Sequence, residues 1–144
     1  MAIKLVNVYK RYEYGKVEAL KNISFEFAEG LFYMIVGPSG SGKTTLLNII
    51  TGIDTPSSGK VFVDDIEISK LNESERRKIR LQKFGIVFQF FFLVPYLTGL
   101  ENVMLPLRFL NYDKKLIREK AYNALKMVNA AHLANQYPTE MKIG

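Results

Sequence analysis

The stretch Gly37-Pro38-Ser39-Gly40-Ser41-Gly42-Lys43-Thr44 decides the fold class of this 144-residue chain. It matches the pattern G-x-x-x-x-G-K-[ST], in which the backbone N–H groups of a glycine-rich turn point inward at phosphate oxygens. Lys43 is placed to neutralise charge on the β- and γ-phosphates, and Thr44 offers a hydroxyl to Mg²⁺. We therefore predict that the chain binds a nucleoside triphosphate. The alternative is a glycine- and serine-rich connector that carries an accidental lysine.

The residues on either side of the loop fit a strand, a turn and a helix. Residues 31–36 are apolar throughout, which predicts a strand buried on both faces of a central sheet, and residues 84–88 predict a second strand of this kind. Residues 44–51 predict a short helix that ends just before Gly52.

Two further segments carry an alternating pattern: residues 3–8 are mostly apolar with partial alternation, and residues 23–27 alternate cleanly between apolar and polar side chains. Each predicts a strand with one wet face, so we expect the two to be antiparallel. Residues 59–63 predict another strand. The fold class is therefore α/β: a P-loop NTPase-type sheet with an antiparallel portion early in the chain and a helical segment later.

The helical predictions rest on caps and on apolar faces. Asn72, with Glu75 three residues later, predicts the start of a charged helix. Residues 98–110 predict a helix that Pro106 bends or breaks. Residues 113–129 predict a helix whose apolar face holds Ile117, Ala121, Ala124, Leu125 and Val128.

The composition excludes several classes of protein. The chain has no cysteine and one histidine, so a disulfide framework, a cysteine zinc site and a thiol nucleophile are excluded. Its longest apolar run, residues 86–97, is interrupted by Gln89 and Pro95, whereas a helix that crosses a bilayer needs about 20 such residues. The net charge of +6 favours an anionic partner.

The sequence around the loop resembles the ATP-binding subunit of an ABC transporter, in particular the group of lipoprotein-release, macrolide-export and cell-division ATPases. The resemblance covers nearly all of the chain, from residue 3 to about residue 140. It is carried by Tyr12 ahead of residues 19–24, by residues 51–61, by residues 86–89 followed by 93–103, and by residues 105–107.

The resemblance implies ATP and Mg²⁺ as ligands and assigns site residues. Tyr12 stands where the family has its adenine-stacking aromatic; the alternative is one of eight tyrosines on a strand. Gln89 stands where the family has a glutamine near Mg²⁺ and the attacking water; the alternative is a loop side chain in solvent. Lys43 and Gln89 are the implied catalytic residues, and Thr44 and Gln89 the implied metal contacts. The implied nucleotide contacts are Tyr12, Gly37, Pro38, Ser39, Gly40, Ser41, Gly42, Lys43, Thr44 and Thr45.

Three surface features carry alternatives of their own. The apolar residues 90–94 depart from the family at positions 90 and 92, which are usually polar, and form either the groove for a membrane partner or part of the core. Residues 70–83 hold six positive and two negative charges and form either a lipid-binding face or a solvated one. Without a nucleic-acid motif we expect no nucleic-acid partner. Asp64 and Asp65 are expected in a turn.

The last residues depart from the family. Tyr137-Pro138-Thr139-Glu140 should lead into Leu-Ser-Gly-Gly-Gln, but Met141-Lys142-Ile143-Gly144 follows. No Walker B aspartate, catalytic glutamate or switch histidine is found in the sequence. We therefore expect one incomplete ABC-type domain over residues 1–144, with a nucleotide-binding core at 1–97, a helical subdomain at 98–144 and the C-terminal part of the fold missing.

The implied function is coupling of ATP binding and hydrolysis to substrate movement. The implied partners are a transmembrane permease subunit and a second ATP-binding subunit, and the implied location is cytoplasmic, peripheral on the inner face of the cell membrane. The chain by itself is expected to bind ATP at most. The alternatives are an inactive nucleotide-binding remnant or split-gene fragment, and a different phosphate-loop enzyme such as a small kinase.

Overall fold

The computed structural model describes residues 1–110 and 112–141. The chain divides into two compact units, Met1–Gly85 and Ile86–Gly144. The boundary that we expect after residue 97, between a nucleotide-binding core and a helical subdomain, stays a prediction. The departure from the family sequence at residues 142–144 lies outside the described residues.

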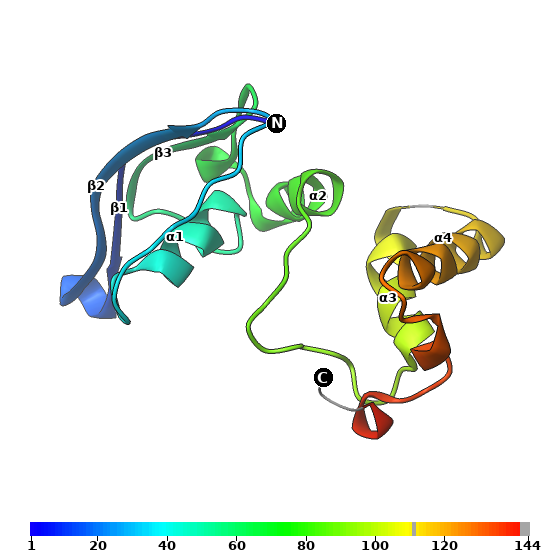
Figure 1. Ribbon diagram of the computed structural model, residues 1–144. Coiled ribbons are helices and arrows are strands. Elements are labelled where there is room, and N and C mark those ends of the chain that lie inside the picture. The colour runs from blue at the N-terminus through cyan, green and yellow to red at the C-terminus, as the bar shows by residue number, and fades with distance from the viewer. Residues whose placement is uncertain (111, 142–144) are drawn as a thin grey trace. The chain divides into compact units, whose positions relative to one another are not determined.

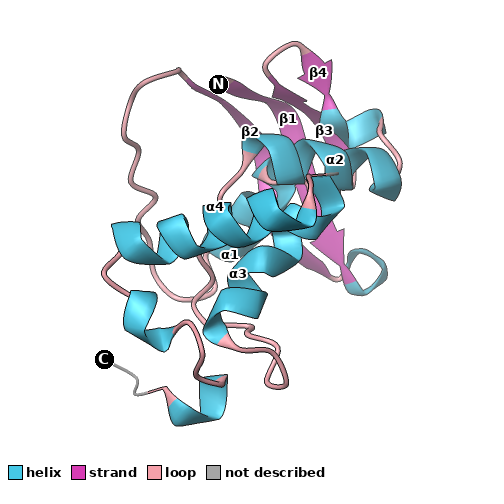
Figure 2. Ribbon diagram, turned by 90° about the vertical axis from the view of Figure 1, so that its right-hand side faces the viewer, coloured by secondary structure: helices cyan, strands magenta, loops and turns pink. Residues whose placement is uncertain are grey.

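The first unit is built on a four-stranded antiparallel sheet in the order β2-β1-β3-β4 (Figures 1 and 2). Its strands are β1 (Ile3–Tyr12), β2 (Val17–Phe27), β3 (Ser58–Val63) and β4 (Ile66–Glu67). In β1, Ile3 pairs with Phe27 of β2 on one side and with Val63 of β3 on the other. The antiparallel pairing of the two alternating segments is therefore confirmed, and both strands are longer than predicted.

One face of this sheet packs against α1 (Lys43–Ile50), the helix that follows the glycine-rich loop (Figure 1). The buried side chains of this core are Leu5, Val8, Leu20, Ile49, Ile50, Val61, Val63 and Ile68. Full burial of one such aliphatic side chain stabilises the fold by about 1.5–3 kcal/mol. The core therefore fixes α1, and with it the loop that leads into α1, against the sheet.

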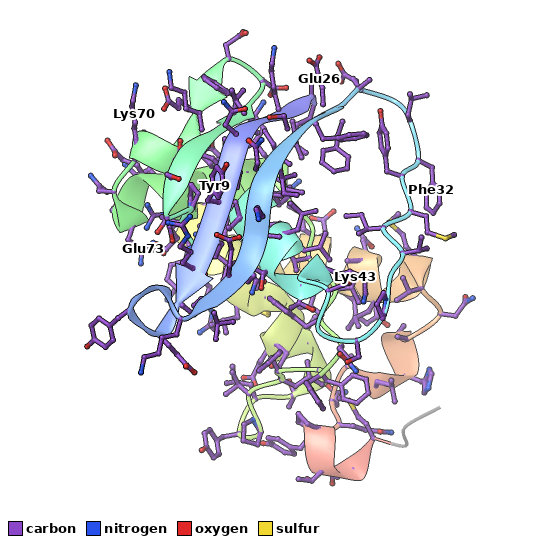
Figure 3. The ribbon with its side chains drawn as sticks, turned by 90° about the vertical axis from the view of Figure 1, so that its left-hand side faces the viewer. Tyr9, Glu26, Phe32, Lys43, Lys70 and Glu73 are labelled. Atoms are coloured by element: carbon purple, nitrogen blue, oxygen red, sulfur yellow. The ribbon has the colours of Figure 1, made fainter. Side chains whose placement is uncertain are left out.

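Two predicted central strands are not strands in the structure. Residues 31–36 and 84–88 are extended chain without strand assignment, and the side chains of Phe32 and Val87 are 89% and 99% exposed. Figure 3 shows Phe32 on the segment that follows β2. A strand forms only where a neighbour completes its hydrogen-bond ladder, and within residues 1–110 and 112–141 no ladder partner is assigned to either segment. The prediction of buried strands at these positions is therefore wrong for the described chain.

In segment 31–36, the side chain of Tyr33 packs against two aromatic residues of β2. Its ring meets those of Phe25 and Phe27 edge to face, with centroid distances of 5.9 and 5.0 Å. Its hydroxyl accepts a hydrogen bond of 2.8 Å from the backbone N–H of Ala28. Tyr33 therefore holds the segment to the end of β2, and Ile35 is the other half-buried residue of the segment.

The predicted charged helix is present as α2 (Glu73–Lys83), with a complete capping box between Asn72 and Glu75. Its basic residues are not all solvated. Arg76 donates to the carbonyl oxygen of Leu71 at 2.6 Å, and Arg80 donates to that of Gly52, in the turn after α1. Arg80 therefore ties α2 to the turn after α1, and Arg76 ties it to the residue before its cap. A solvated or lipid-facing role does not explain these two arginines.

The second unit packs α3 (Gly99–Leu107) against α4 (Lys114–Met127), with Leu100, Ala121, Leu125 and Ala134 in its core. Thr98 caps α3, and the helix gives way to a 3-10 turn, Arg108–Leu110, just after Pro106, as predicted. On α4 the predicted apolar face is correct for Ile117, Ala121 and Leu125 only. Ala124 lies at the edge of that stripe and Val128 follows the last helical residue, so both are exposed.

Among the described residues, no helix has both the length and the apolar character that a bilayer crossing requires.

Candidate nucleotide-binding site

The glycine-rich loop adopts a tight turn at the N-terminus of α1. Gly42, the residue before the helix, has a φ of 86°, and a Cβ there would collide with the carbonyl oxygen of Ala19 on β2. A Cβ on Gly37 would lie 2.8 Å from the Oγ of Ser41, because the loop curls back on itself. Gly42 is therefore required both by space and by backbone conformation, whereas Gly37, with a φ of 157°, is required by its backbone conformation.

The side chain of Lys43 returns to this loop (Figure 3). Its Nζ donates hydrogen bonds to the carbonyl oxygens of Gly37 and Pro38 at 2.8 and 2.6 Å, and lies 3.4 Å from the Oγ of Ser41. A positive charge thus lies at the mouth of the loop, beside a helix N-terminus that adds further positive potential. The partners of the Lys43 ammonium in this structure are neutral carbonyl oxygens. The charged oxygens of a phosphate would bind the ammonium more strongly.

The donor set fits Mg²⁺-bound phosphate. Thr44 is exposed in the first turn of α1, one residue after Lys43, and a hydroxyl oxygen is a ligand that Mg²⁺ accepts. The curled backbone and the ammonium supply the positive counterpart for the phosphates. The residues present therefore fit the ligand that the sequence predicts.

Tyr12 ends β1 and lies close to the same helix. Its hydroxyl donates a hydrogen bond of 2.8 Å to Oδ2 of Asp54, and its side chain is 37% exposed. Burial raises the pKa of the Tyr12 phenol, and the Asp54 carboxylate raises it further, whereas the hydroxyl of Thr45 acts in the opposite direction. Thr45 belongs to the first turn of α1, so Tyr12 and the start of that helix are neighbours.

Asp54 was not among the residues predicted for the site. It follows α1, and its Oδ1 accepts hydrogen bonds from Nζ of Lys10 and from the backbone N–H of Thr55, both at 2.7 Å. Burial acts to raise the pKa of Asp54, but the bonds from Lys10, Tyr12 and Thr55 outweigh it and hold the pKa below its ordinary value. The signal in the sequence was the stretch 51–61, which carried the family resemblance without a role for any single residue.

Gln89 lies in the second unit, in the extended segment before α3, and its side chain is exposed. The loop 37–44 belongs to the first unit, so the assignment of Gln89 to the site stays a prediction. The neighbouring phenylalanines are exposed and gather by themselves: the rings of Phe88 and Phe92 lie 5.2 Å apart, and those of Phe90 and Phe92 lie 6.5 Å apart. In this structure they are not folded into a core.

Asp64 and Asp65 form the turn between β3 and β4, as predicted. Asp64 accepts hydrogen bonds of 3.0 Å from the backbone N–H of Ala2 and from Nζ of Lys83. Asp64 therefore links this turn to the start of β1 and to the end of α2.

A glycine-rich loop with its lysine, held between a sheet and the helix that follows, defines a phosphate-loop nucleotide-binding domain of the α/β class. A family model described as ABC transporter matches residues 20–143. The chain belongs to this family, as an ATP-binding domain of the ABC ATPase type. The resemblance predicted from the sequence is confirmed.

The relatives support this assignment. The chain is 45% identical to the uncharacterised ABC transporter ATP-binding protein MJ0796 of Methanocaldococcus jannaschii, over 99% of the chain and 63% of that protein. It is 40% identical to the lipoprotein-releasing system ATP-binding protein LolD of Saccharophagus degradans, again over 99% of the chain and 63% of the relative. The chain thus spans about 63% of the length of these relatives.

Solved structures agree in fold. The dimeric structure of MJ0796 in a post-hydrolysis state, bound to ADP and Pi, superposes with a TM-score of 0.90 and 44% identity. That superposition covers 97% of this chain and 63% of the other. A second dimeric structure of MJ0796 gives the same values.

Proposed function

We propose that this chain binds MgATP, with the phosphates on the loop 37–44 and the adenine against Tyr12. The observation that carries the proposal is the ammonium of Lys43, which lies at the carbonyl oxygens of Gly37 and Pro38 at the N-terminus of α1. A cation held there by neutral oxygens is ready to exchange them for those of a phosphate.

Each residue of the loop has a role in this proposal. The phosphates are surrounded by the backbone of the loop and of the first turn of α1. The proposed N–H donors are those of Gly37, Ser39, Gly40, Ser41, Gly42, Thr44 and Thr45, and Pro38, which has no N–H, shapes the turn. Lys43 balances β- and γ-phosphate charge and Thr44 holds Mg²⁺ through its hydroxyl. Gln89 is the second proposed contact to the metal and the proposed orienting group for the attacking water. When bound, Mg²⁺ supplies charge neutralisation between the phosphates.

In the whole protein, we propose that the domain couples ATP binding and hydrolysis to the movement of a substrate. Its proposed partners are a transmembrane permease subunit and a second ATP-binding subunit, and its proposed place is the inner face of the cell membrane, on the cytoplasmic side. Membership of the ABC transporter family supports the first partner, and the dimeric MJ0796 structures support the second. The division into a nucleotide-binding core at 1–97 and a helical subdomain at 98–144 is part of this proposal.

Thermal unfolding with and without MgATP tests the binding proposal. We expect millimolar MgATP to raise the midpoint of the first unit's unfolding, because a ligand that binds only the folded state stabilises it. Lys43→Ala is expected to remove this shift. Lys70→Ala is the matched control, since Lys70 forms a surface ion pair of 2.9 Å with Glu67 and is expected to keep the shift.

Two outcomes would contradict the proposal. If MgATP does not shift the wild-type midpoint, the chain does not bind it. If Lys43→Ala shifts as much as wild type, binding occurs elsewhere. Phosphate release is measured on the same samples. Release of phosphate would show that the chain hydrolyses ATP, and binding without release would show that it only binds ATP.

A further inference from the structure

We propose that Asp54 is a positioning residue for the nucleotide base: through the hydroxyl of Tyr12 it fixes the ring on which the base stacks. This inference rests on the proposed ATP binding and adds a residue that the site did not include. Its basis is the hydrogen bond of 2.8 Å from the Tyr12 hydroxyl to Oδ2 of Asp54, between positions 42 residues apart. The hydroxyl lies at the far end of the side chain, so this bond fixes the direction of the ring.

Asp54 is itself held firmly enough to act as an anchor. Oδ1 receives two hydrogen bonds of 2.7 Å, from Lys10 and from the N–H of Thr55, which leaves Oδ2 for Tyr12. The Lys10 side chain is only 12% exposed, and its Nζ also donates to the carbonyl oxygen of Thr55 at 2.9 Å. The carboxylate therefore stays charged, and both of its oxygens have fixed partners.

The anchor is also tied to the helix that carries the phosphate loop. The backbone N–H of Asp54 donates to the carbonyl oxygen of Asn48 on α1 at 3.0 Å. Tyr12 in turn is bonded to Asp54 through its hydroxyl, so the ring is tied to the same helix by way of Asp54. The ring on β1 and the loop before α1 are thus both fixed to α1, which sets the separation between a stacked base and its phosphates.

One face of the ring is already occupied. Nζ of Lys10 lies 4.8 Å from the ring centroid of Tyr12, within the range of a cation–π contact. The residue is nevertheless 37% exposed, so part of the ring stays accessible, and a base would stack on the face opposite Lys10. Lys10 therefore makes two contacts: it donates a hydrogen bond to Asp54, and its ammonium lies over one face of the Tyr12 ring.

The hydroxyl of Tyr12 is therefore expected to strengthen nucleotide binding, although the hydroxyl itself does not stack on the base. A ring without its anchor must be ordered when the base binds, and the ordering of one side chain weakens binding by about two- to tenfold. Tyr12→Phe keeps the ring and removes only the hydroxyl, so it isolates the anchor from the stacking.

The test compares MgATP with magnesium tripolyphosphate, which has the phosphates but no base, on the 144-residue chain. We expect Tyr12→Phe and Asp54→Asn each to weaken MgATP binding by about two- to tenfold and to leave tripolyphosphate binding unchanged. The two substitutions remove the same hydrogen bond, so their effects are not expected to add. The double variant is therefore expected to bind MgATP as weakly as whichever single variant binds it less tightly, and no more weakly than that. Asp64→Asn is the matched control: Asp64 also accepts from a lysine and a backbone N–H, but in the turn after β3.

A second readout does not need a ligand. In chain labelled with ¹³C at the tyrosine Cζ, the Tyr12 signal is identified by its loss in Tyr12→Phe. Asp54→Asn is expected to lower the pH at which that signal titrates, and Asp64→Asn to leave it in place.

The outcomes separate the two proposals. If Tyr12→Phe binds MgATP as tightly as wild type, or if Asp54→Asn leaves the Tyr12 titration unchanged, the positioning role is wrong while ATP binding stands. If a variant weakens tripolyphosphate as much as MgATP, the carboxylate acts on the loop and not on the base, which also overturns the inference. If wild type binds neither ligand, the proposed function fails and the role of Asp54 in it fails too.

Discussion

The guanidinium of Arg80 donates a hydrogen bond to the carbonyl oxygen of Gly52, 28 positions earlier in the chain. The same side chain forms an ion pair of 2.6 Å with Glu73, so Gly52 and Glu73 together hold the guanidinium in place. Gly52 lies in the turn directly after α1, the helix that the phosphate loop begins. One arginine on α2 therefore holds the far end of the helix on which nucleotide binding is proposed to depend.

Arg80→Ala is expected to destabilise the chain by about 1–3 kcal/mol, because it removes a charge-assisted hydrogen bond to a partly buried carbonyl group. The exposed Arg77 on the same helix is the control, and Arg77→Ala is expected to change stability by less than about 0.5 kcal/mol. Urea unfolding followed by circular dichroism measures both. Equal effects of the two substitutions would show that the basic side chains of α2 form only a solvated face.

The glycine at the start of α1 gives a second prediction. Gly42→Ala puts a Cβ against the carbonyl oxygen of Ala19 at a positive φ, so we expect a greater loss than the roughly 1–2 kcal/mol that a left-handed conformation alone costs. Gly30→Ala is the matched control, because Gly30 has a φ of 76° but open space around the added Cβ. Denaturant unfolding of both variants separates the collision from the backbone strain. A Gly42→Ala variant no less stable than Gly30→Ala would contradict the close approach of the loop to β2.

The extended segment 31–36 gives a third prediction. Leu31 is 65% exposed, whereas Leu5 on β1 is buried in the core. Leu5→Ala is expected to destabilise the first unit by about 2–5 kcal/mol, and Leu31→Ala by less than about 0.5 kcal/mol. Thermal unfolding of both variants tests this difference. A loss of several kcal/mol in Leu31→Ala would show that segment 31–36 is buried in this chain after all.

This contrast also shows where prediction from the sequence succeeded and failed. The antiparallel strands around Leu5, the capped helices at Asn72 and Thr98 and the loop before Lys43 were predictable, because each depends on a pattern within a short stretch. Whether residues 31–36 become a strand depends on a neighbouring strand elsewhere in a chain, which their own apolar pattern does not contain. Asp54 was missed for a similar reason: its partner Tyr12 lies on another element, and neither residue has an unusual local pattern.

The pKa of Asp54 gives a prediction for pH dependence. Burial acts to raise this pKa, but the bonds from Lys10, Tyr12 and Thr55 lower it below the ordinary value of 3.8. A carboxyl whose pKa is lower in the folded state stabilises the fold above its unfolded pKa, and this stabilisation is lost as the pH falls through the folded pKa. We therefore expect Asp54→Asn to be less stable than wild type at neutral pH and the difference to shrink below about pH 4.

Thermal unfolding between neutral pH and about pH 3 measures this difference. Tyr12→Phe is the control, because it keeps the carboxylate with its bonds from Lys10 and Thr55 and is expected to keep most of the pH dependence. A stability difference between Asp54→Asn and wild type that does not change over this range would contradict a charged, hydrogen-bonded Asp54.

Binding of MgATP at the loop before α1 is tested most directly by a titration of the ¹⁵N-labelled chain with MgATP, followed through the backbone amide signals. Binding as proposed predicts the largest shifts at the amides of Gly40, Gly42, Lys43 and Thr44, and it predicts that Lys43→Ala removes them. Shifts confined to other parts of the chain, or no shifts at millimolar MgATP, would contradict binding at this loop.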